Sequence, residues 1–286
     1  MPSYSVVILH HNKVDYSRAC LASLLQSSAR PLQVINLDNG SSDGTLALLE
    51  EWEEWAAATG IEATTLRYAE NIGAIRGRNA ALEVATGSHL AFLDNDTIVA
   101  QANWLEELGR ALNAQGEIGI VAPKLLFPWA PHAIECCGCA VSPGGRIQYL
   151  ARGLGRDSVE AARPVQCAIS AAWLMKRLMV EQIGVLDEAF SPVQYEDLDY
   201  CYRARAAGWQ VWTAPTVEVY HFEHTTTAGS DDINFGYVTA KNGVLFKKRW
   251  GQTFAAEDGA TEAEAAWQSL PKRSIDEVDW EELLPS

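Results

Sequence analysis

Short apolar runs alternate with amphipathic stretches along the first hundred residues. Four runs have the length and composition of buried strands, at residues 5–9, 32–37, 63–68 and 90–93. Between them, apolar residues recur at helical spacing, which predicts helices over residues 16–26, from Ser41 or Ser42 to about residue 58, and from residues 71–73 to residue 85. Such alternation is typical of a parallel sheet covered by helices. The sequence therefore predicts an α/β fold.

The pattern continues less regularly after residue 100. It predicts helices at residues 104–112, up to residue 183 and at 195–207, and strands at residues 118–122, 165–175, 210–213 and 217–220. Residues 127–164 are rich in Gly, Pro and Arg and give no clear element. No domain boundary is evident before about residue 225. We therefore expect one mixed-sheet domain followed by a C-terminal helical extension.

Polar clusters follow the first, second and fourth predicted strands, at residues 10–12, 38–43 and 94–96. Because the carboxyl ends of parallel strands meet at one edge of a sheet, we expect these clusters to converge on a ligand. Helices that start after two of the clusters would offer free N–H groups to an anion. The glycine fingerprints of dinucleotide-binding and P-loop proteins are absent from the sequence, which excludes those nucleotide sites.

The last of these clusters, Asp94-Asn95-Asp96, brings two carboxylates to the end of a buried strand. Neighbouring carboxylates repel each other unless a cation or a proton offsets their charge. The triplet therefore suggests a divalent metal held by Asp96, with Asp94 as a second ligand, although a strand-ending turn also accounts for Asp and Asn here. Arg76 and Arg78 on the preceding helix could pair with a diphosphate or could be ordinary surface arginines.

A second acidic cluster, Glu196-Asp197-Leu198-Asp199, begins the helix predicted at residues 195–207. The helix dipole favours acids in a first turn, so capping alone explains one or two of them. Asp197 is nevertheless a candidate general base for a hydroxyl, because it is a carboxylate. His221 and His224 end the last predicted strand and are either metal ligands or ordinary polar residues.

The amino-acid composition excludes some classes of protein. The net charge of −15 argues against non-specific nucleic-acid binding. From residue 255 onward, nine acidic residues oppose two basic ones, which predicts a solvated acidic extension. The six cysteines are expected to be free packing residues, since Cys136-Cys137-Gly138-Cys139 has no second pair at zinc-ribbon spacing. No apolar stretch is long enough to span a bilayer and no secretory signal is evident, so we expect a cytoplasmic protein, with peripheral membrane contact left open.

Several motifs share an order and spacing with a known family. They are Val6-Val7-Ile8-Leu9 with Asn12, Asp38-Asn39-Gly40-Ser41-Ser42-Asp43-Gly44, Glu70-Asn71-Ile72-Gly73 with Arg78-Asn79, Leu93-Asp94-Asn95-Asp96, Gly184-Val185-Leu186-Asp187-Glu188-Ala189-Phe190, Tyr195-Glu196-Asp197-Leu198-Asp199 with Arg203 and Ala207-Gly208-Trp209, and Val219-Tyr220-His221. On these motifs the chain resembles the family 2 glycosyltransferases, inverting enzymes of the GT-A fold, and especially their bacterial rhamnosyltransferase-like branch. The resemblance covers roughly residues 4–250.

This resemblance implies an architecture. A GT-A domain would occupy residues 1–250, with a Rossmann-like half at residues 1–100 that mainly binds the nucleotide-sugar and a mixed-sheet half at residues 101–225 that mainly faces the acceptor. Residues 251–286 would form the acidic C-terminal extension.

The resemblance also implies roles for individual residues. Asp38, Asn71, Arg78 and Asp94, with Asn12, would bind the nucleotide-sugar. Asp96, helped by Asp94, would bind Mn²⁺ or Mg²⁺ bridging the diphosphate, and His221 or His224 would complete the metal site. Asp197, aided by Glu196, would be the general base.

The implied activity is metal-dependent transfer of a sugar from a nucleoside-diphosphate sugar to an acceptor hydroxyl, by a single displacement. The acceptor could be a saccharide, a lipid-linked saccharide or a small molecule. Two alternatives remain: a non-catalytic relative that binds nucleotide-sugars or glycans, and a phosphatase of the haloacid dehalogenase type. The second alternative expects its aspartates after the first strand, whereas here they follow the fourth.

Overall fold

The first half of the chain alternates strands and helices as the sequence predicts. The structure is a computed structural model that describes residues 2–223, 225, 233–259 and 268–285. The first elements are β1 (Tyr4–His10), α1 (Val14–Leu25), β2 (Leu32–Asn39), α2 (Thr45–Ala58), β3 (Glu62–Tyr68), α3 (Ala74–Val84) and β4 (His89–Asp94). The chain continues with β5 (Thr97–Val99), α4 (Trp104–Leu112), β6 (Ile118–Leu126), β7 (Ile134–Cys136), β8 (Cys139–Val141), β9 (Ile147–Tyr149), η1 (Arg156–Ser158), β10 (Arg163–Val165), β11 (Ala172–Lys176), α5 (Arg177–Ile183), η2 (Glu188–Phe190), α6 (Glu196–Ala206), β12 (Gln210–His221), α7 (Phe235–Ala256), η3 (Ile275–Glu277) and η4 (Trp280–Leu283).

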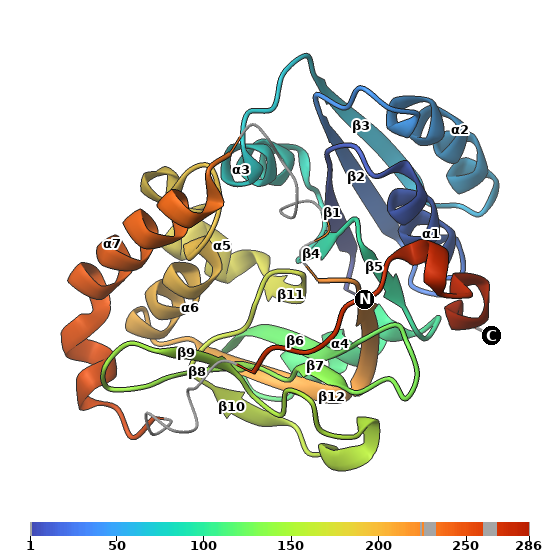
Figure 1. The fold of residues 1–286 in the computed structure, drawn as a ribbon. Helices are drawn as coiled ribbons and strands as arrows, with labels where there is room; N and C mark the ends of the chain where they lie inside the picture. Colours follow the sequence, from blue (N-terminus) through green and yellow to red (C-terminus); the bar gives the residue numbers. More distant parts are fainter. Residues whose placement is uncertain (1, 224, 226–232, 260–267, 286) are drawn as a thin grey trace.

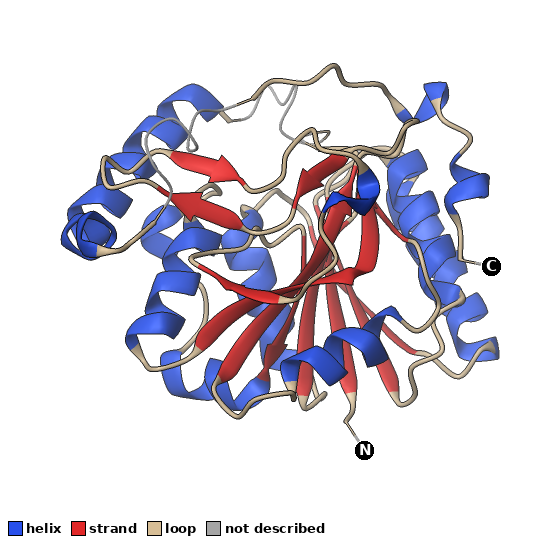
Figure 2. Cartoon of the chain, turned by 90° about the horizontal axis from the view of Figure 1, so that it is seen from below, coloured by secondary structure: helices blue, strands red, loops and turns tan. Residues whose placement is uncertain are grey.

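One mixed sheet of ten strands forms the centre of the molecule, and helices cover both of its faces (Figures 1 and 2). Its strand order is β10-β12-β6-β11-β4-β1-β2-β3, with β5 added to β12 and β7 added to β6. Strands β1 to β4 are parallel, whereas β11 runs antiparallel to both of its neighbours. The predicted α/β fold with a mixed sheet is confirmed.

The register of the parallel strands brings their polar ends together. β1 lies between β2 and β4, with His10 opposite Asp38 and Leu9 opposite Asp94. All of β2 and nearly all of β1 and β4 are buried, as is typical of parallel strands covered on both faces. Polar residues can therefore reach solvent only where these strands end.

Two predicted strand boundaries in the second half are wrong. The strand expected at residues 165–175 is two strands, β10 and β11, because the two segments pair with different partners: β10 with β12, and β11 with β4 and β6. The two strands expected at residues 210–213 and 217–220 are one, β12, whose pairing with β6 shifts register on the way.

Residues 127–164, which gave no clear pattern, form three short strands, a 3₁₀ turn and the start of β10. β7 pairs with β6, while β8 and β9 form a separate two-stranded sheet. All six cysteines are free and buried, which confirms that they are packing residues. Such short strands carry too few residues to show a period, which explains why the sequence did not predict them.

The starts of α1 and α2 differ from the prediction. Neither Ser41 nor Ser42 caps α2; the carboxylate of Asp43 accepts the N–H of Thr45 at 2.9 Å and also that of Val14, the first residue of α1, at 3.1 Å. The hydrogen bonds from these groups outweigh the effect of burial and lower the pKa of Asp43. The carboxylate of Asp43 thus binds N–H groups at these helix starts, where the sequence had led us to expect a bound anion.

The C-terminal residues are more than a solvated extension, which corrects that prediction. The side chains of Ile275 and Leu283 are buried in a small apolar cluster with Ala19 and Phe222, and the backbone N–H of Ile275 donates to the Tyr16 hydroxyl at 3.1 Å. The acidic residues of η3 and η4 remain on the outer side. Among the helices that the structure describes, the 22-residue α7 included, none is long and apolar enough to cross a membrane.

Candidate functional site

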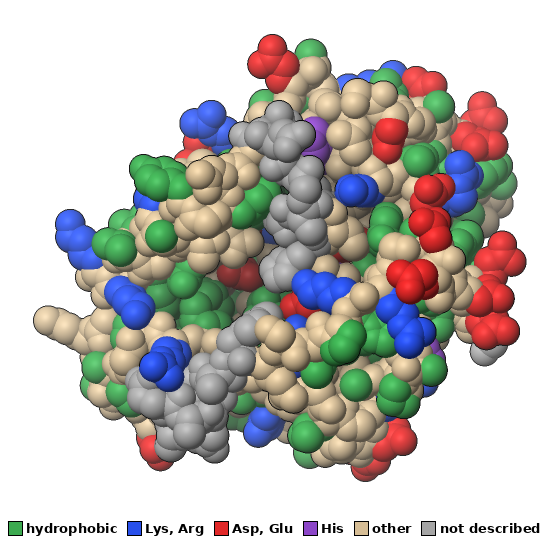
Figure 3. Space-filling model, in the orientation of Figure 1, with side chains coloured by type: hydrophobic (Ala, Val, Ile, Leu, Met, Phe, Trp, Pro, Cys, Tyr) green, Lys and Arg blue, Asp and Glu red, His purple; other side chains and the backbone are tan. Residues whose placement is uncertain are grey.

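A cavity of about 410 Å³ opens at the edge where the parallel strands end. His11, Asn39 and the Asp94–Asp96 turn all line it, so each of the three strand-end clusters contributes, and their predicted convergence is confirmed. The opposite wall comes from β9, from the chain before β11 and from the start of α6. Figure 3 shows this side of the molecule hollowed, with acidic and apolar side chains inside the depression.

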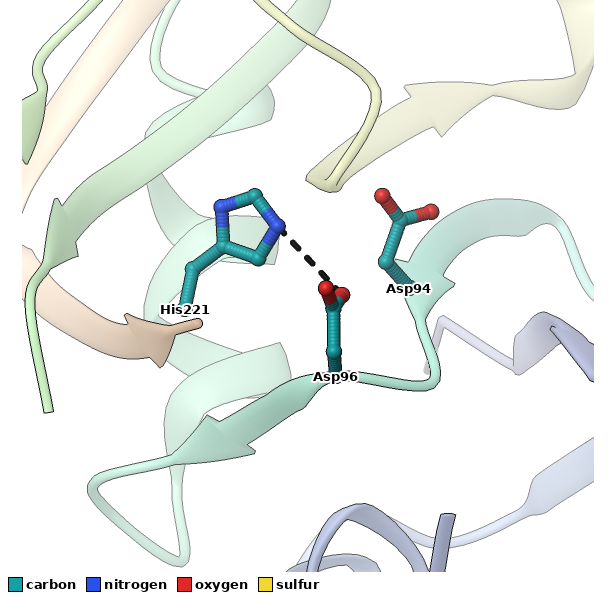
Figure 4. A group of neighbouring side chains, drawn as sticks. All are labelled: Asp94, Asp96 and His221. Atoms are coloured by element: carbon teal, nitrogen blue, oxygen red, sulfur yellow. Dashed lines mark ion pairs between the residues drawn. The ribbon is translucent and has the colours of Figure 1, made fainter. Parts of the chain in front are cut away.

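Three potential metal ligands meet in the cavity. Asp94 ends β4, Asp96 lies in the turn to β5, and His221 ends β12 (Figure 4). One ligand atom from each lies within 4.8 Å of the others. Two carboxylates and one imidazole are a donor set that suits a divalent ion such as Mn²⁺, so these residues fit the metal that the sequence led us to expect. His224, the other candidate ligand, lies outside the described residues.

Asp96 is held as a carboxylate. Its Oδ1 lies 3.3 Å from His221 Nε2, and its Oδ2 accepts a hydrogen bond from Thr225 Oγ1 at 2.6 Å. Burial alone would raise the pKa of Asp96, but the charge of His221 and these hydrogen bonds lower it to about 2. In turn, the carboxylates of Glu135 and Asp96 outweigh burial and raise the pKa of His221 well above its usual value.

Arg78 joins the metal side of the cavity to the other wall. Its Nη2 pairs with Asp94 Oδ1, and its Nη1 donates to the Ser170 hydroxyl at 2.6 Å and lies 3.6 Å from Glu196 Oε1. The guanidinium also stacks over Phe92. Burial raises the pKa of Asp94, whereas the charge of Arg78 opposes that rise. Arg78 is therefore a buried cation shared by two carboxylates.

The predicted acidic pair lies at the far side of the cavity, in the first turn of α6. Asp197 Oδ1 accepts the N–H of Leu198 at 2.8 Å, and Oδ2 accepts the N–H of Ser170 at 3.4 Å. Burial raises the pKa of Asp197; burial and then the charge of Asp197 raise the pKa of Glu196 to about 7. A raised pKa makes a carboxylate a stronger base, which suits removal of a proton from a hydroxyl.

The turn before α6 is strained, and hydrogen bonds from a residue of α7 hold it in place. Gln194 and Tyr195 have φ values of 82° and 72°, which cost energy for residues with side chains. The buried side-chain amide of Asn242 donates to the carbonyl oxygens of Val193 and Gln194, both at 2.9 Å. α7 thereby holds the backbone that sets the direction of the acidic pair.

Two interlocked loops build the side of the cavity where the sequence predicts a nucleotide. Asn39 Nδ2 donates to Asn71 Oδ1 at 2.8 Å, and Asn39 Oδ1 accepts the N–H of Ile72 at 2.9 Å. Gly40 adopts a φ of +75° beside this contact, and a Cβ there would lie 2.8 Å from the carbonyl carbon of Glu70. Asn71 therefore lines the cavity in a fixed orientation.

Two residues expected at the nucleotide are not among those lining the cavity. Asp38 is 3% exposed and accepts the N–H of Ser41 at 3.3 Å, while Asn12 Oδ1 accepts the N–H of Ser42 at 2.8 Å. Both side chains shape the turn after β2, and their roles at a nucleotide stay predictions. Arg76 also lies outside the cavity, paired at 2.9 Å with Glu188 on the surface.

Several residues of the site were not predicted. Ser170 lay inside an expected strand, and Tyr149 and Glu223 had no pattern to mark them. Glu135 Oε2 lies 2.8 Å from His221 Nδ1, on the side of the ring away from Asp96. A signal for Glu135 does exist in the sequence: it is a single charge inside the apolar run Ala133-Ile134-Glu135-Cys136-Cys137, where an unpaired charge would be costly.

Comparison with known proteins finds relatives of this chain. The family model described as Glycosyl transferase family 2 matches residues 5–132. The uncharacterized protein y4gI of Sinorhizobium fredii is 27% identical over 257 residues, 87% of this chain and 28% of that protein. The O-antigen biosynthesis protein RfbC of Myxococcus xanthus is 30% identical over 228 residues, 77% of this chain and 17% of that protein. The chain thus spans less than a third of the length of either relative.

A solved structure shares the fold. The crystal structure of GalNAc-T7 with UDP, GalNAc and Mn²⁺ matches 97% of this chain and 53% of its own, with a TM-score of 0.71 and 18% identity. At that identity the likeness concerns the fold alone.

Proposed function

Because this chain belongs to glycosyl transferase family 2 and has the GT-A fold, we propose that it is a metal-dependent, inverting glycosyltransferase. It would move a sugar from a nucleoside-diphosphate sugar to an acceptor hydroxyl. One observation carries the proposal: a potential metal site, Asp94, Asp96 and His221, and a buried acidic pair, Glu196 and Asp197, face a single cavity.

The two sides of the cavity would have different roles in the reaction, one binding the donor and the metal and the other activating the acceptor. Asp96 and His221, with Asp94, would hold Mn²⁺ or Mg²⁺, and a bound ion of this kind neutralises the charge that builds on a departing diphosphate. Asn71 and Arg78 would orient the donor against that site. Asp38 and Asn12 would act on the nucleotide through the turn that they shape.

On the other side, Asp197 would accept the proton of the acceptor hydroxyl. The acceptor oxygen would form a bond to the anomeric carbon as the bond to the diphosphate breaks, which inverts the configuration in one step. Glu196, with its pKa of about 7, would remain partly protonated beside Asp197 and limit the repulsion between the two acids. Removing such a base typically costs about 10²–10⁴-fold in rate.

Donor and acceptor are proposed only as classes. The sequence motifs favour the bacterial rhamnosyltransferase-like branch, and that assignment stays a prediction, as does a cytoplasmic location. A saccharide, a lipid-linked saccharide or a small molecule would fit as acceptor, since apolar side chains such as Ile147, Tyr149 and Phe235 line the acceptor side of the cavity.

The alternatives are less well supported. A non-catalytic binding relative would have no need for the buried pair Glu196 and Asp197, whose burial raises both pKa values. The phosphatase alternative required the D-x-D motif after the first strand of its sheet, and here Asp94 ends β4.

Donor turnover tests the proposal. Purified protein is incubated with UDP-, dTDP- and GDP-sugars, with Mn²⁺ or with EDTA, and free nucleoside diphosphate is measured. We expect release from one donor class, dependent on the metal and stimulated by an acceptor. No release from any donor with any acceptor tried, despite metal-dependent nucleotide binding, would favour the non-catalytic alternative.

A further inference from the structure

His221 is held on both of its ring nitrogens, and the second contact has no role in the chemistry above. Nε2 faces Asp96, and Nδ1 lies 2.8 Å from the carboxylate of Glu135 on β7. We propose that Glu135 is a positioning residue that orients His221 for the metal. The inference rests on the proposed function, since it assigns the partner that makes the histidine an effective ligand.

The geometry fixes which nitrogen is available. With a metal bound, a carboxylate on Nδ1 would hold the proton there and leave the Nε2 lone pair for the metal. His221 ends β12 and its backbone pairs with Thr97 of β5, so the backbone is fixed and the groups that contact the ring set its orientation about the side-chain bonds. Glu135 therefore sets both the ring orientation and the proton position.

The burial of Glu135 supports a specific role. The residue is 0% exposed, and no hydrogen-bond partner is found for its Oε1 among the described residues. An apolar residue at such a position is often neutral or stabilising relative to a buried ion pair. Stability alone thus gives little reason for a carboxylate behind His221, whereas orientation of a metal ligand gives a direct one.

Neighbouring charges make this burial tolerable. Arg152 Nη2 pairs with Glu223 Oε2 at 2.9 Å, with both side chains 1% exposed, and Arg152 Nη1 donates to the backbone carbonyl oxygen of Glu135 at 3.4 Å. Lys272 of the C-terminal segment reaches the same Glu223 carboxylate at 3.2 Å. These contacts place the positive charge of Arg152 near the buried carboxylates of Glu135 and Glu223, and the C-terminal segment adds the positive charge of Lys272.

The test compares three variants by their affinity for Mn²⁺, titrated as MnCl₂ in the presence of UDP or GDP and followed by electron paramagnetic resonance. Glu135→Ala should raise the Kd for Mn²⁺ about 10–100-fold. Glu135→Gln should raise it by less, because it keeps an acceptor at the same reach. Glu160→Gln removes the same charge from an exposed position and should leave the Kd unchanged.

The possible results distinguish failure of the proposed function from failure of the positioning role of Glu135. If the wild type fails to bind Mn²⁺, the proposed function is wrong. If the wild type binds and both Glu135 variants match it, or if Glu135→Gln is as weak as Glu135→Ala, the positioning role is wrong and the proposed function survives.

A second measurement needs no metal and no active enzyme. Histidine ¹⁵N resonances of the metal-free protein, assigned with His221→Gln, report the hydrogen bonding of each ring nitrogen. We expect the Nδ1 resonance of His221 to move in Glu135→Gln, which keeps the size of the side chain and should fold. An unchanged resonance would overturn the inference.

Discussion

Arg78 donates a hydrogen bond to the hydroxyl of Ser170 at 2.6 Å, and this contact links the two halves of the cavity. The same guanidinium pairs with Asp94, while the backbone N–H of Ser170 donates to Asp197 at 3.4 Å. A short path of polar contacts therefore runs from a metal-side carboxylate to the proposed base. A substitution of Arg78 should therefore affect both Asp94 on the metal side and Asp197 on the other wall of the cavity.

We predict that Arg78→Met lowers both stability and metal-dependent nucleotide binding. Removing one partner of a buried ion pair leaves uncompensated charge and costs up to about 3–5 kcal/mol in the free energy of unfolding. Arg76→Met, two residues away on α3, breaks an exposed pair with Glu188 and should cost about 0–1 kcal/mol. Urea denaturation of both variants measures the difference, and equal losses would show that Arg78 is no more important than a surface arginine.

Asp197→Asn should separate binding from transfer. The variant keeps the size of the side chain and an oxygen for the N–H of Leu198, but it cannot accept the acceptor proton. We expect donor affinity within a few-fold of wild type and a kcat lower by about 10²–10⁴-fold. Asp157→Asn, at an exposed position, is the control. Retained transfer in Asp197→Asn would remove Asp197 from the role of base.

Acid should destabilise the protein through His10. Its ring is fully buried between Ser17 and Asn36, and burial lowers its pKa from 6.5 to about 4. The unfolded chain therefore binds a proton that the folded protein does not, and stability is lost as the pH falls from 6.5 to 4. The loss amounts to about 3 kcal/mol.

Denaturation at pH 7.5 and pH 4.5 measures this effect as a difference between wild type and His10→Gln. The variant does not titrate and should lose less stability on acidification. An identical loss in both proteins would mean that other groups account for the acid sensitivity.

The C-terminal segment should contribute to stability. Ile275 is 6% exposed and packs against the α1 side of the molecule, so Ile275→Ala should cost about 2 kcal/mol and lower the Tm. Leu154→Ala, at a position 51% exposed, should change little. An unchanged Tm in Ile275→Ala would indicate that the segment is not anchored in solution.

The sequence predicted the first half of the fold well, for a physical reason. Buried parallel strands such as β1, β2 and β4 are continuous apolar runs, and the helices between them have a clear period. In the second half, β11 and β12 pair with strands that are distant in the sequence, so their boundaries depend on contacts that no local pattern records.

The same distinction applies to the site. Asp94, Asp96 and Asp197 follow strand ends or begin a helix, where acidic clusters stand out, and all three line the cavity. Glu135 contacts His221, which is 86 residues away along the chain, and Ser170 contacts Arg78, which is 92 residues away. Only the folded structure brings such partners together.

One measurement tests the central claim most directly. The Tm of the wild type and of Asp96→Asn is measured with UDP, dTDP, GDP and their sugars, each with and without Mn²⁺. A ligand that binds only the folded state must raise its Tm. We predict that one nucleotide raises the Tm of the wild type only when Mn²⁺ is present, and that Asp96→Asn abolishes the rise. A wild-type Tm that stays flat across the whole panel would contradict the assignment of a metal-dependent nucleotide-sugar site.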